Sequence, residues 1–146
     1  MRKKQETASY FKDFVTDRYR YKGIEIFVSV KKRLRKYEAY SKWINMVSEI
    51  NCSSAVVING GYGEFALMLS MCHPSLKTYA FERDEDKCLV AMHSAEDVAK
   101  NLAFSSVIPA DFMQEARYGI SPLIYLVEPT TEDEAMYQKY NPIIIK

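Results

Sequence analysis

Cysteine and histidine are scarce in this sequence, which limits the metal sites and disulfide bonds that it can form. The three cysteines, Cys52, Cys72 and Cys88, do not have the spacing of metal ligands, and His73 and His93 are the two histidines. We therefore expect no structural zinc site and no metal, and we interpret the cysteines as free thiols. Free thiols are typical of a reducing compartment, which points to the cytoplasm.

Long apolar runs are lacking too. No stretch of about 18 apolar residues occurs, which argues against a transmembrane helix, and residues 1–6 have no apolar core behind them, so no signal peptide is expected. The chain has 146 residues, of which 48% are hydrophobic and 27% charged. A chain of this size buries roughly 70% of its unfolded surface. We predict one domain over residues 1–146, with a helical extension over 1–50 and a core over 51–146.

The net charge is only +1, but the two parts of the chain differ in sign. Residues 1–50 hold 13 Lys and Arg against 6 Asp and Glu, whereas residues 51–146 hold 7 against 13. One interpretation is that the two parts neutralise each other in the folded protein. The other is that the basic part faces an anionic surface.

Two helical patterns precede the core. The first covers residues 7–22 and ends before Gly23. The second covers residues 24–49 and has one apolar stripe, made of Phe27, Val30, Leu34, Tyr37, Tyr40, Ile44 and Val47. These patterns favour two helices packed on the core with a solvated basic face. They do not favour nucleic acid as a partner, and contact of the basic helices with a membrane surface stays an alternative.

From residue 55 onward, short apolar runs alternate with helical patterns. The runs predict five strands, at residues 55–58, 78–81, 105–108, 123–127 and 143–145. Between them we expect helices at 63–72, from 84 to about 98, at 112–118 and from 130 to 141. This alternation predicts an α/β fold with a parallel sheet of order 3-2-1-4-5 and a ligand crevice between strands one and four.

The first strand of the core runs into a glycine-rich turn. Asn59-Gly60-Gly61-Tyr62-Gly63 follows the strand and leads into a helical pattern. Glycines allow a sharp turn and a close approach of the backbone to a ligand, and the helix N-terminus behind them offers free N–H groups. The second strand ends at Glu82, whose carboxylate can accept hydrogen bonds from both hydroxyls of a ribose.

These residues resemble the motifs of class I S-adenosylmethionine-dependent methyltransferases, over roughly residues 40–146. Val56–Ala66 resembles the first motif of that family, and Tyr79–Asp84 resembles the second, which carries the ribose-binding acid. Pro109-Ala110-Asp111 lies where the family has an acid near the adenine, and Leu123–Pro129 resembles the fourth motif, at the acceptor site.

The resemblance implies a Rossmann-like methyltransferase fold with S-adenosylmethionine as the cofactor. It implies a cofactor-binding loop at Asn59, Gly60, Gly61, Tyr62 and Gly63, a ribose ligand at Glu82 and an adenine ligand at Asp111. Glu128, directly after the fourth strand, is the candidate catalytic base, and Tyr62 is a candidate for stacking on the ligand.

Two positions depart from the family pattern. Val57 stands where the family has an acid that helps to order the loop, and Asn59 replaces the first glycine of the loop. The sixth and seventh strands of the family's sheet are missing. The segment Arg18–Gly23 also resembles methyltransferase-like domains of bacterial exporter and lysophospholipid acyltransferase fusion proteins, although the sequence has no His-x4-Asp acyltransferase motif.

Three interpretations of function therefore stay open. The first is an S-adenosylmethionine-binding methyltransferase-like domain, which is an enzyme if it transfers the methyl group. The second is a catalytically degenerate domain of the same fold that serves as an interaction or regulatory module of a larger polypeptide. The third is an NAD-binding module, because Gly61–Ala66 also matches the G-x-G-x-x-A pattern of dinucleotide-binding loops.

The last expectation concerns the edge of the sheet at strand five. Ile143, Ile144 and Ile145 form an apolar, β-branched run without a charge. An edge of this kind tends to recruit another strand or to be covered. We therefore expect a contact at this edge, either with a second copy of the chain or with other domains of a longer polypeptide.

Overall fold

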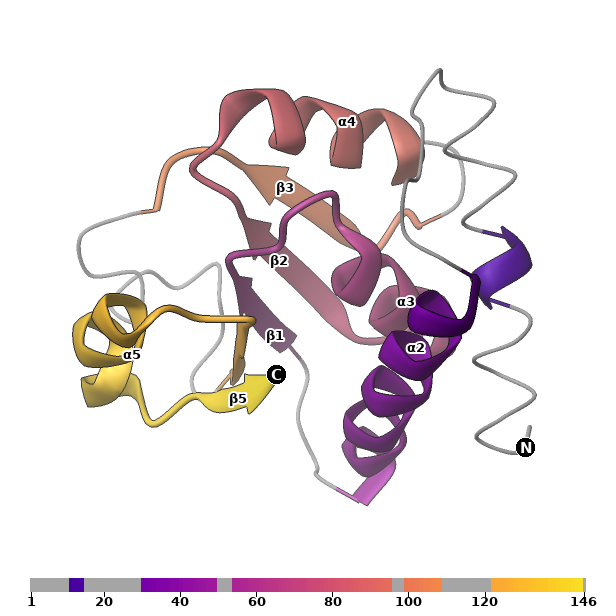
Figure 1. Ribbon diagram of the computed structural model, residues 1–146, viewed down its shortest axis with the longest axis horizontal. Coiled ribbons are helices and arrows are strands. Elements are labelled where there is room, and N and C mark those ends of the chain that lie inside the picture. Colours follow the sequence, from indigo (N-terminus) through magenta and orange to yellow (C-terminus); the bar gives the residue numbers. More distant parts are fainter. Residues whose placement is uncertain (1–10, 15–29, 50–53, 96–98, 109–121, 146) are drawn as a thin grey trace. The chain divides into compact units, whose positions relative to one another are not determined.

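The computed structural model describes residues 11–14, 30–49, 54–95, 99–108 and 122–145. The chain divides into two compact units, Met1–Asn51 and Cys52–Lys146. Figure 1 shows the elements of each unit, coloured along the sequence. No helix within the described residues is long and apolar enough to cross a membrane.

The N-terminal unit is helical where the structure describes it. Residues 11–14 form a helical turn, α2 spans Val30–Asn45, and a 3-10 helix, η1, spans Met46–Glu49. Residues 15–29 lie outside the described part of the chain. The predicted helices over 7–22 and 24–49 are therefore described only in these pieces.

The apolar stripe of the second predicted helix is confirmed where it is described. Tyr37, Tyr40, Ile44 and Val47 are buried, whereas Arg35 is exposed. The ring of Tyr37 packs edge to face on that of Phe11, with the centroids 5.3 Å apart. Aromatic contacts of this geometry stabilise packing beyond the area that they bury.

The core unit contains one parallel sheet. Its strands are β1 (Ser54–Ile58), β2 (Lys77–Phe81), β3 (Leu102–Ser105), β4 (Leu123–Val127) and β5 (Ile143–Ile145). They lie in the order β3-β2-β1-β4-β5, and every neighbouring pair is parallel (Figure 1). This confirms the predicted α/β fold and the strand order 3-2-1-4-5.

Helices cover both faces of the sheet. They are α3 (Glu64–Cys72), α4 (Glu85–Ala95), α5 (Thr131–Tyr137) and a 3-10 turn, η4 (Gln138–Tyr140). On one face, Phe65 of α3 packs on Tyr125, with the ring centroids 5.0 Å apart. On the other face, Tyr137 of α5 joins a buried cluster with Val56 and Leu126. Because neighbouring residues of a strand point to opposite faces, Tyr125 and Leu126 identify the two sides.

One strand lies earlier in the chain than predicted. The third strand was predicted at residues 105–108, which is wrong, because β3 ends at Ser105. Its start is fixed by β2, since the N–H of Thr78 donates to the carbonyl of Asn101 at 2.8 Å. The predicted run included Val107, but that side chain is 71% exposed beyond the sheet. Pairing with a neighbouring strand outweighs local propensity at this position. The helix predicted at 112–118 lies outside the described residues.

Gly63 connects the sheet to α3. Its φ is 86°, in the left-handed region, and it is the last residue before the helix. A Cβ atom at this position would lie 2.8 Å from the Cβ of Ala91 and 2.9 Å from the Cζ of Phe104. Gly61 is also left-handed, with φ 58°, but a Cβ there would meet no atom within 4 Å. Gly63 is therefore required for both backbone conformation and space, and Gly61 for conformation alone.

Replacing Gly63 by alanine should destabilise the protein more than replacing Gly61. Both substitutions carry the strain of a left-handed alanine, about 1–2 kcal/mol. Only Gly63→Ala also forces Ala91 or Phe104 to move, which adds about 1–3 kcal/mol. Denaturant unfolding followed by circular dichroism gives both free energies. Equal losses of unfolding free energy for the two variants would show that the side chains packed between α3, α4 and β3 move without a free-energy cost.

Candidate functional site

The loop between β1 and α3 is hydrogen-bonded to the end of β2. The N–H of Gly60 donates to the carbonyl of Phe81 at 3.0 Å. Within the loop, the N–H of Gly63 donates to the carbonyl of Gly60 at 2.8 Å. These bonds hold the glycine turn at the carboxyl ends of β1 and β2. That place is next to the switch point between β1 and β4, where open α/β sheets bind ligands.

Glu82 follows β2 directly, and its side chain is bonded to the glycine turn. Oε1 accepts a hydrogen bond from the N–H of Gly61 at 2.9 Å, and Oε2 accepts one from the N–H of Asp84 at 2.9 Å. The two backbone donors fix the orientation of this half-buried carboxylate. An ionised carboxylate has about four lone-pair sites, so about two remain for other donors.

Asn59 opens the loop in a left-handed conformation, with φ 62°. Its Nδ2 donates to Oδ2 of Asp133 at 2.8 Å. Asp133 also forms a capping box with Thr130, in which each side chain accepts a hydrogen bond from the backbone of the other. The pKa of Asp133 lies below its ordinary value, chiefly because its carboxylate accepts a hydrogen bond from the Thr130 backbone. Partial burial opposes this effect, and hydrogen bonds from the side chains of Thr130 and Asn59 add to it. The loop is thus tied to the first turn of α5.

A second link to α5 starts at Arg83. Its Nη2 donates to the hydroxyl of Tyr137 at 2.6 Å and lies 3.0 Å from the sulfur of Met136. The guanidinium is also 5.8 Å from the centroid of the Tyr137 ring, within the range of a cation–π contact. Burial raises the pKa of Tyr137, so its hydroxyl stays protonated at neutral pH. The ends of β1 and β2 are therefore both bonded to α5.

Tyr62 and Glu128 are two further predicted site residues. Tyr62 is 42% exposed, with the Lys87 ammonium 5.7 Å from its ring centroid. Glu128 is exposed after β4 and has φ 43°, and its N–H donates to the carbonyl of Ile145 at 2.6 Å. Asp111 lies outside the described residues. The structure therefore brings the glycine turn and Glu82 together and places Glu128 at the same edge of the sheet.

Sequence reasoning missed the part that α5 plays at this edge. Asp133 was predicted only as part of the helix from 130 to 141, and Arg83 only as a position in the motif Tyr79–Asp84. Asn59 and Asp133 are 74 positions apart, and Arg83 and Tyr137 are 54 positions apart. Contacts at such separations leave no local pattern. The one available signal was the parallel order of the strands, which gathers all strand-to-helix turns at one edge.

The carboxyl edge of the sheet is strongly acidic. Its strand-to-helix turns and first helical turns contain nine acids and two bases among the described residues. The acids are Glu64, Glu82, Asp84, Glu85, Asp86, Glu128, Glu132, Asp133 and Glu134, and the bases are Arg83 and Lys87. Acids suit the positive ends of helix dipoles, and together they create a field that attracts cations.

Two further observations bear on the chemistry of this edge. The described residues contain no group of three or more His, Cys, Asp or Glu side chains arranged to hold a metal ion. Burial, and then the charge of Glu82, raises the pKa of Cys88, so this thiol is protonated at neutral pH. In comparisons with protein-family models and with curated proteins, the sequence matches none of them.

Asp133→Asn should destabilise the protein at neutral pH but not in acid. The folded pKa of Asp133 lies below its ordinary value of 3.8. The stability that Asp133 contributes to the folded protein is therefore present above that value, and it is lost as the pH falls through the folded pKa. We expect a loss of about 1 kcal/mol at pH 7, typical of a helix cap. Denaturant unfolding at neutral and acidic pH measures the difference, and Glu132→Gln in the same turn is the control. A difference in unfolding free energy between the parent and Asp133→Asn that does not change with pH would contradict this account.

Glu128→Gly should stabilise the fold, and Glu128→Ala should not. A left-handed residue other than glycine costs about 1–2 kcal/mol, whereas glycine loses about 0.5–1 kcal/mol more chain entropy on folding, so the net gain is about 0.5–1 kcal/mol. Alanine keeps the strain and removes only the carboxylate. Thermal unfolding of both variants separates the backbone from the side chain. A less stable Glu128→Gly would show that contacts of the carboxylate outweigh the strain.

Proposed function

We propose that the core unit binds S-adenosylmethionine at the carboxyl edge of β1 and β2 and acts as a methyltransferase-like domain. One contact supports this most directly, the 2.9 Å hydrogen bond from the N–H of Gly61 to Oε1 of Glu82. It joins a turn that a ligand can approach closely to a carboxylate with lone-pair sites to spare. The two hydroxyls of a ribose match those sites.

The space beside Gly61 suits the adenosyl group. A Cβ atom at Gly61 would meet nothing within 4 Å, so the backbone is open on that side. Tyr62, which is exposed next to it, offers a ring that can stack on a flat base. In this arrangement Glu82 binds the ribose, and the glycine turn packs against the chain that carries the sulfur.

S-adenosylmethionine supplies a methyl group that its sulfonium already activates, so the protein needs no strong electrophile. The residues of the carboxyl edge hold the cofactor, orient the acceptor for in-line attack on the methyl carbon and exclude water. Glu128, exposed directly after β4, is the candidate base that takes a proton from the acceptor.

The charge of the carboxyl edge favours S-adenosylmethionine over NAD. Nine acids and two bases among the described residues of this edge repel the phosphates of a dinucleotide and attract a sulfonium. Glu64 also places a carboxylate in the first turn of α3. That is the position where a dinucleotide-binding fold holds the pyrophosphate.

A catalytically degenerate interaction domain is the second candidate. Val57, where the related family has an acid, is completely buried in β1. Asn59, in place of a loop glycine, is bonded to Asp133 of α5. Both observations suit a loop whose residues stabilise the fold instead of binding a cofactor. Such a domain would serve a larger polypeptide through protein contacts.

Calorimetric titration of the chain with S-adenosylmethionine, S-adenosylhomocysteine and NAD tests the proposal. We expect the first two to bind and NAD not to bind. Glu82→Ala should weaken binding of S-adenosylmethionine by about 1.5–3 kcal/mol, the usual loss for hydrogen bonds to a charged group. Glu85→Gln is the matched control, because it removes an exposed carboxylate from the same edge.

The titrations separate the candidates. A chain that is folded by circular dichroism and gives no heat with either adenosyl compound would reject the cofactor proposal and favour the degenerate domain. Equal affinity of the parent and of Glu82→Ala would move the ligand away from this carboxylate. Because Glu82 also bonds the glycine turn, the unfolding free energy of Glu82→Ala is measured alongside.

A further inference from the structure

Helix α2 of the N-terminal unit (Figure 1) is strongly basic. Six bases stand against one acid among its 16 residues, which gives the helix a net charge of +5. The acid is Glu38, and the bases are Lys31, Lys32, Arg33, Arg35, Lys36 and Lys42. This density of positive charge creates a local field that attracts anions. Whether the helix binds an anionic surface depends on where the bases lie and on what neutralises them.

Three of the bases lie on one line along α2, on the side opposite its apolar stripe. Arg35 and Lys42 are seven positions apart, close to two helical turns, and Lys31 lies about one turn before Arg35. The side chains of Arg35 and Lys42 are exposed, whereas Tyr37 and Tyr40 in the stripe are buried. At a rise of about 1.5 Å per residue, the line is about 16 Å long. A flat anionic surface can therefore meet these positions together.

The described part of the chain does not neutralise Arg35 and Lys42. Neither of them forms an ion pair with a described residue. Glu38, the one acid of α2, lies about one turn from each of them and forms no ion pair with either. The two parts of the chain have opposite net charges, but acids of the described residues do not pair with these two bases. Their positive charge is therefore available to a partner.

Apolar groups lie at the C-terminal end of this line. The Lys42 ammonium is 5.4 Å from the ring centroid of Trp43, which is half-buried. Met46 follows three residues later, in η1, and is 40% exposed. Tryptophan is enriched at the boundary between lipid and water, because its ring is apolar and its N–H is polar. A lipid surface therefore offers a partner both to the bases and to Trp43 and Met46, whereas a phosphate backbone offers one only to the bases.

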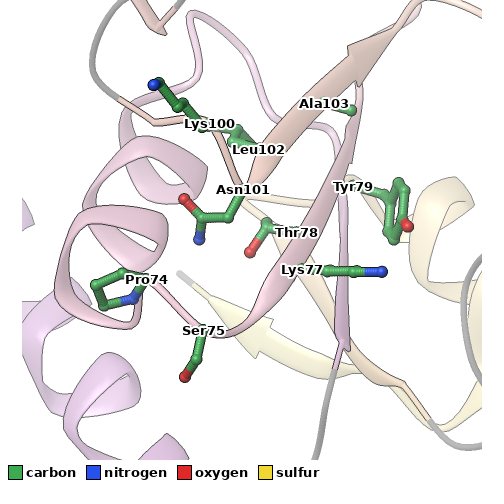
Figure 2. A pocket seen from close by; sticks show the side chains of 9 residues that line it. All are labelled: Pro74, Ser75, Lys77, Thr78, Tyr79, Lys100, Asn101, Leu102 and Ala103. Atoms are coloured by element: carbon green, nitrogen blue, oxygen red, sulfur yellow. The ribbon is translucent and has the colours of Figure 1, made fainter.

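The lysines of the core unit do not form a face of this kind. Lys77 and Lys100 are exposed beside a hollow at the amino ends of β2 and β3. Figure 2 shows their side chains extending to different sides of the strand pair. The two charges therefore do not lie on one face, and this pair of lysines provides a matched control for the bases of α2.

We propose that the basic face of α2, formed by Lys31, Arg35 and Lys42 and bordered by Trp43 and Met46, binds the surface of a membrane that contains anionic phospholipids. The bases attract the headgroups, and the two apolar side chains contact the lipid interface. The contact is peripheral, because the apolar stripe of α2 packs within the protein. The face belongs to the N-terminal unit, so this inference does not rest on the cofactor proposal for the core unit.

Trp43 is the single tryptophan of the chain, so its fluorescence reports on this face directly. The full chain is titrated with vesicles of phosphatidylcholine that contain about 30% phosphatidylserine, and with vesicles of phosphatidylcholine alone. We expect the anionic vesicles to shift the emission of Trp43 to shorter wavelength and brominated lipid to quench it, because the ring enters the interface. Vesicles of phosphatidylcholine alone should cause neither change. Binding should weaken strongly as NaCl is raised from about 0.1 M to about 0.5 M, because salt screens the charges.

Variants assign the binding to this face. The double variant Arg35→Gln, Lys42→Gln should bind anionic vesicles about thirtyfold more weakly, since each base near an anionic membrane strengthens binding about fivefold. The charge-preserving double variant Arg35→Lys, Lys42→Arg should bind like the parent. The control Lys77→Gln, Lys100→Gln removes the same net charge from the core unit and should lose less than about threefold. Circular dichroism verifies that each variant is folded.

Four results would overturn the proposal. The first is the absence of binding to the anionic vesicles at about 0.1 M NaCl. The second is unchanged affinity in Arg35→Gln, Lys42→Gln. The third is an equal loss in the control Lys77→Gln, Lys100→Gln, which would show that binding follows the net charge of the chain. The fourth is binding to a DNA duplex of about 20 base pairs without binding to the anionic vesicles, which would assign the face to nucleic acid.

Discussion

The carboxyl edge of the core depends on the hydrogen bonds between the glycine turn and the end of β2. Two donors of the turn are satisfied from outside it, because the N–H of Gly60 bonds to the carbonyl of Phe81 and the N–H of Gly61 bonds to the carboxylate of Glu82. Glu82 therefore shapes the turn before it meets any ligand. Removing its side chain would release the Gly61 N–H as well as remove the proposed ribose ligand, and neither effect can be read from the other.

The contacts of α5 add a second constraint to the same edge. Asn59 bonds to Asp133, and Arg83 bonds to Tyr137, so the ends of β1 and β2 are both joined to one short helix. In a binding domain these bonds fix the width of the crevice and lower the entropy that a ligand must lose. In a degenerate domain the same bonds replace the ligand as the partner of the loop. The bonds themselves are common to both candidates, and occupancy of the Glu82 carboxylate distinguishes them.

Much of the fold could be predicted from the sequence because alternating strands and helices allow few arrangements of a parallel sheet. The meeting of the glycine turn and Glu82 followed from the same rule, since parallel strands end at one edge. The position of β3 could not be predicted, because its pairing with β2 from Leu102 onward outweighs the β-branched residues near Val107. The bonds from Asn59 to Asp133 and from Arg83 to Tyr137 depend on the packing of distant segments, which local patterns do not encode.

The described acids of the carboxyl edge give this end of the sheet a negative field. The strands from β1 to β5 are at most five residues long, so the two edges lie about 17 Å apart. This distance is about twice the screening length in physiological salt, so each edge presents its own field to the solvent. Diffusing cations are therefore guided to the carboxyl edge, and the amino edge at the other end of the strands lies beyond the reach of that field.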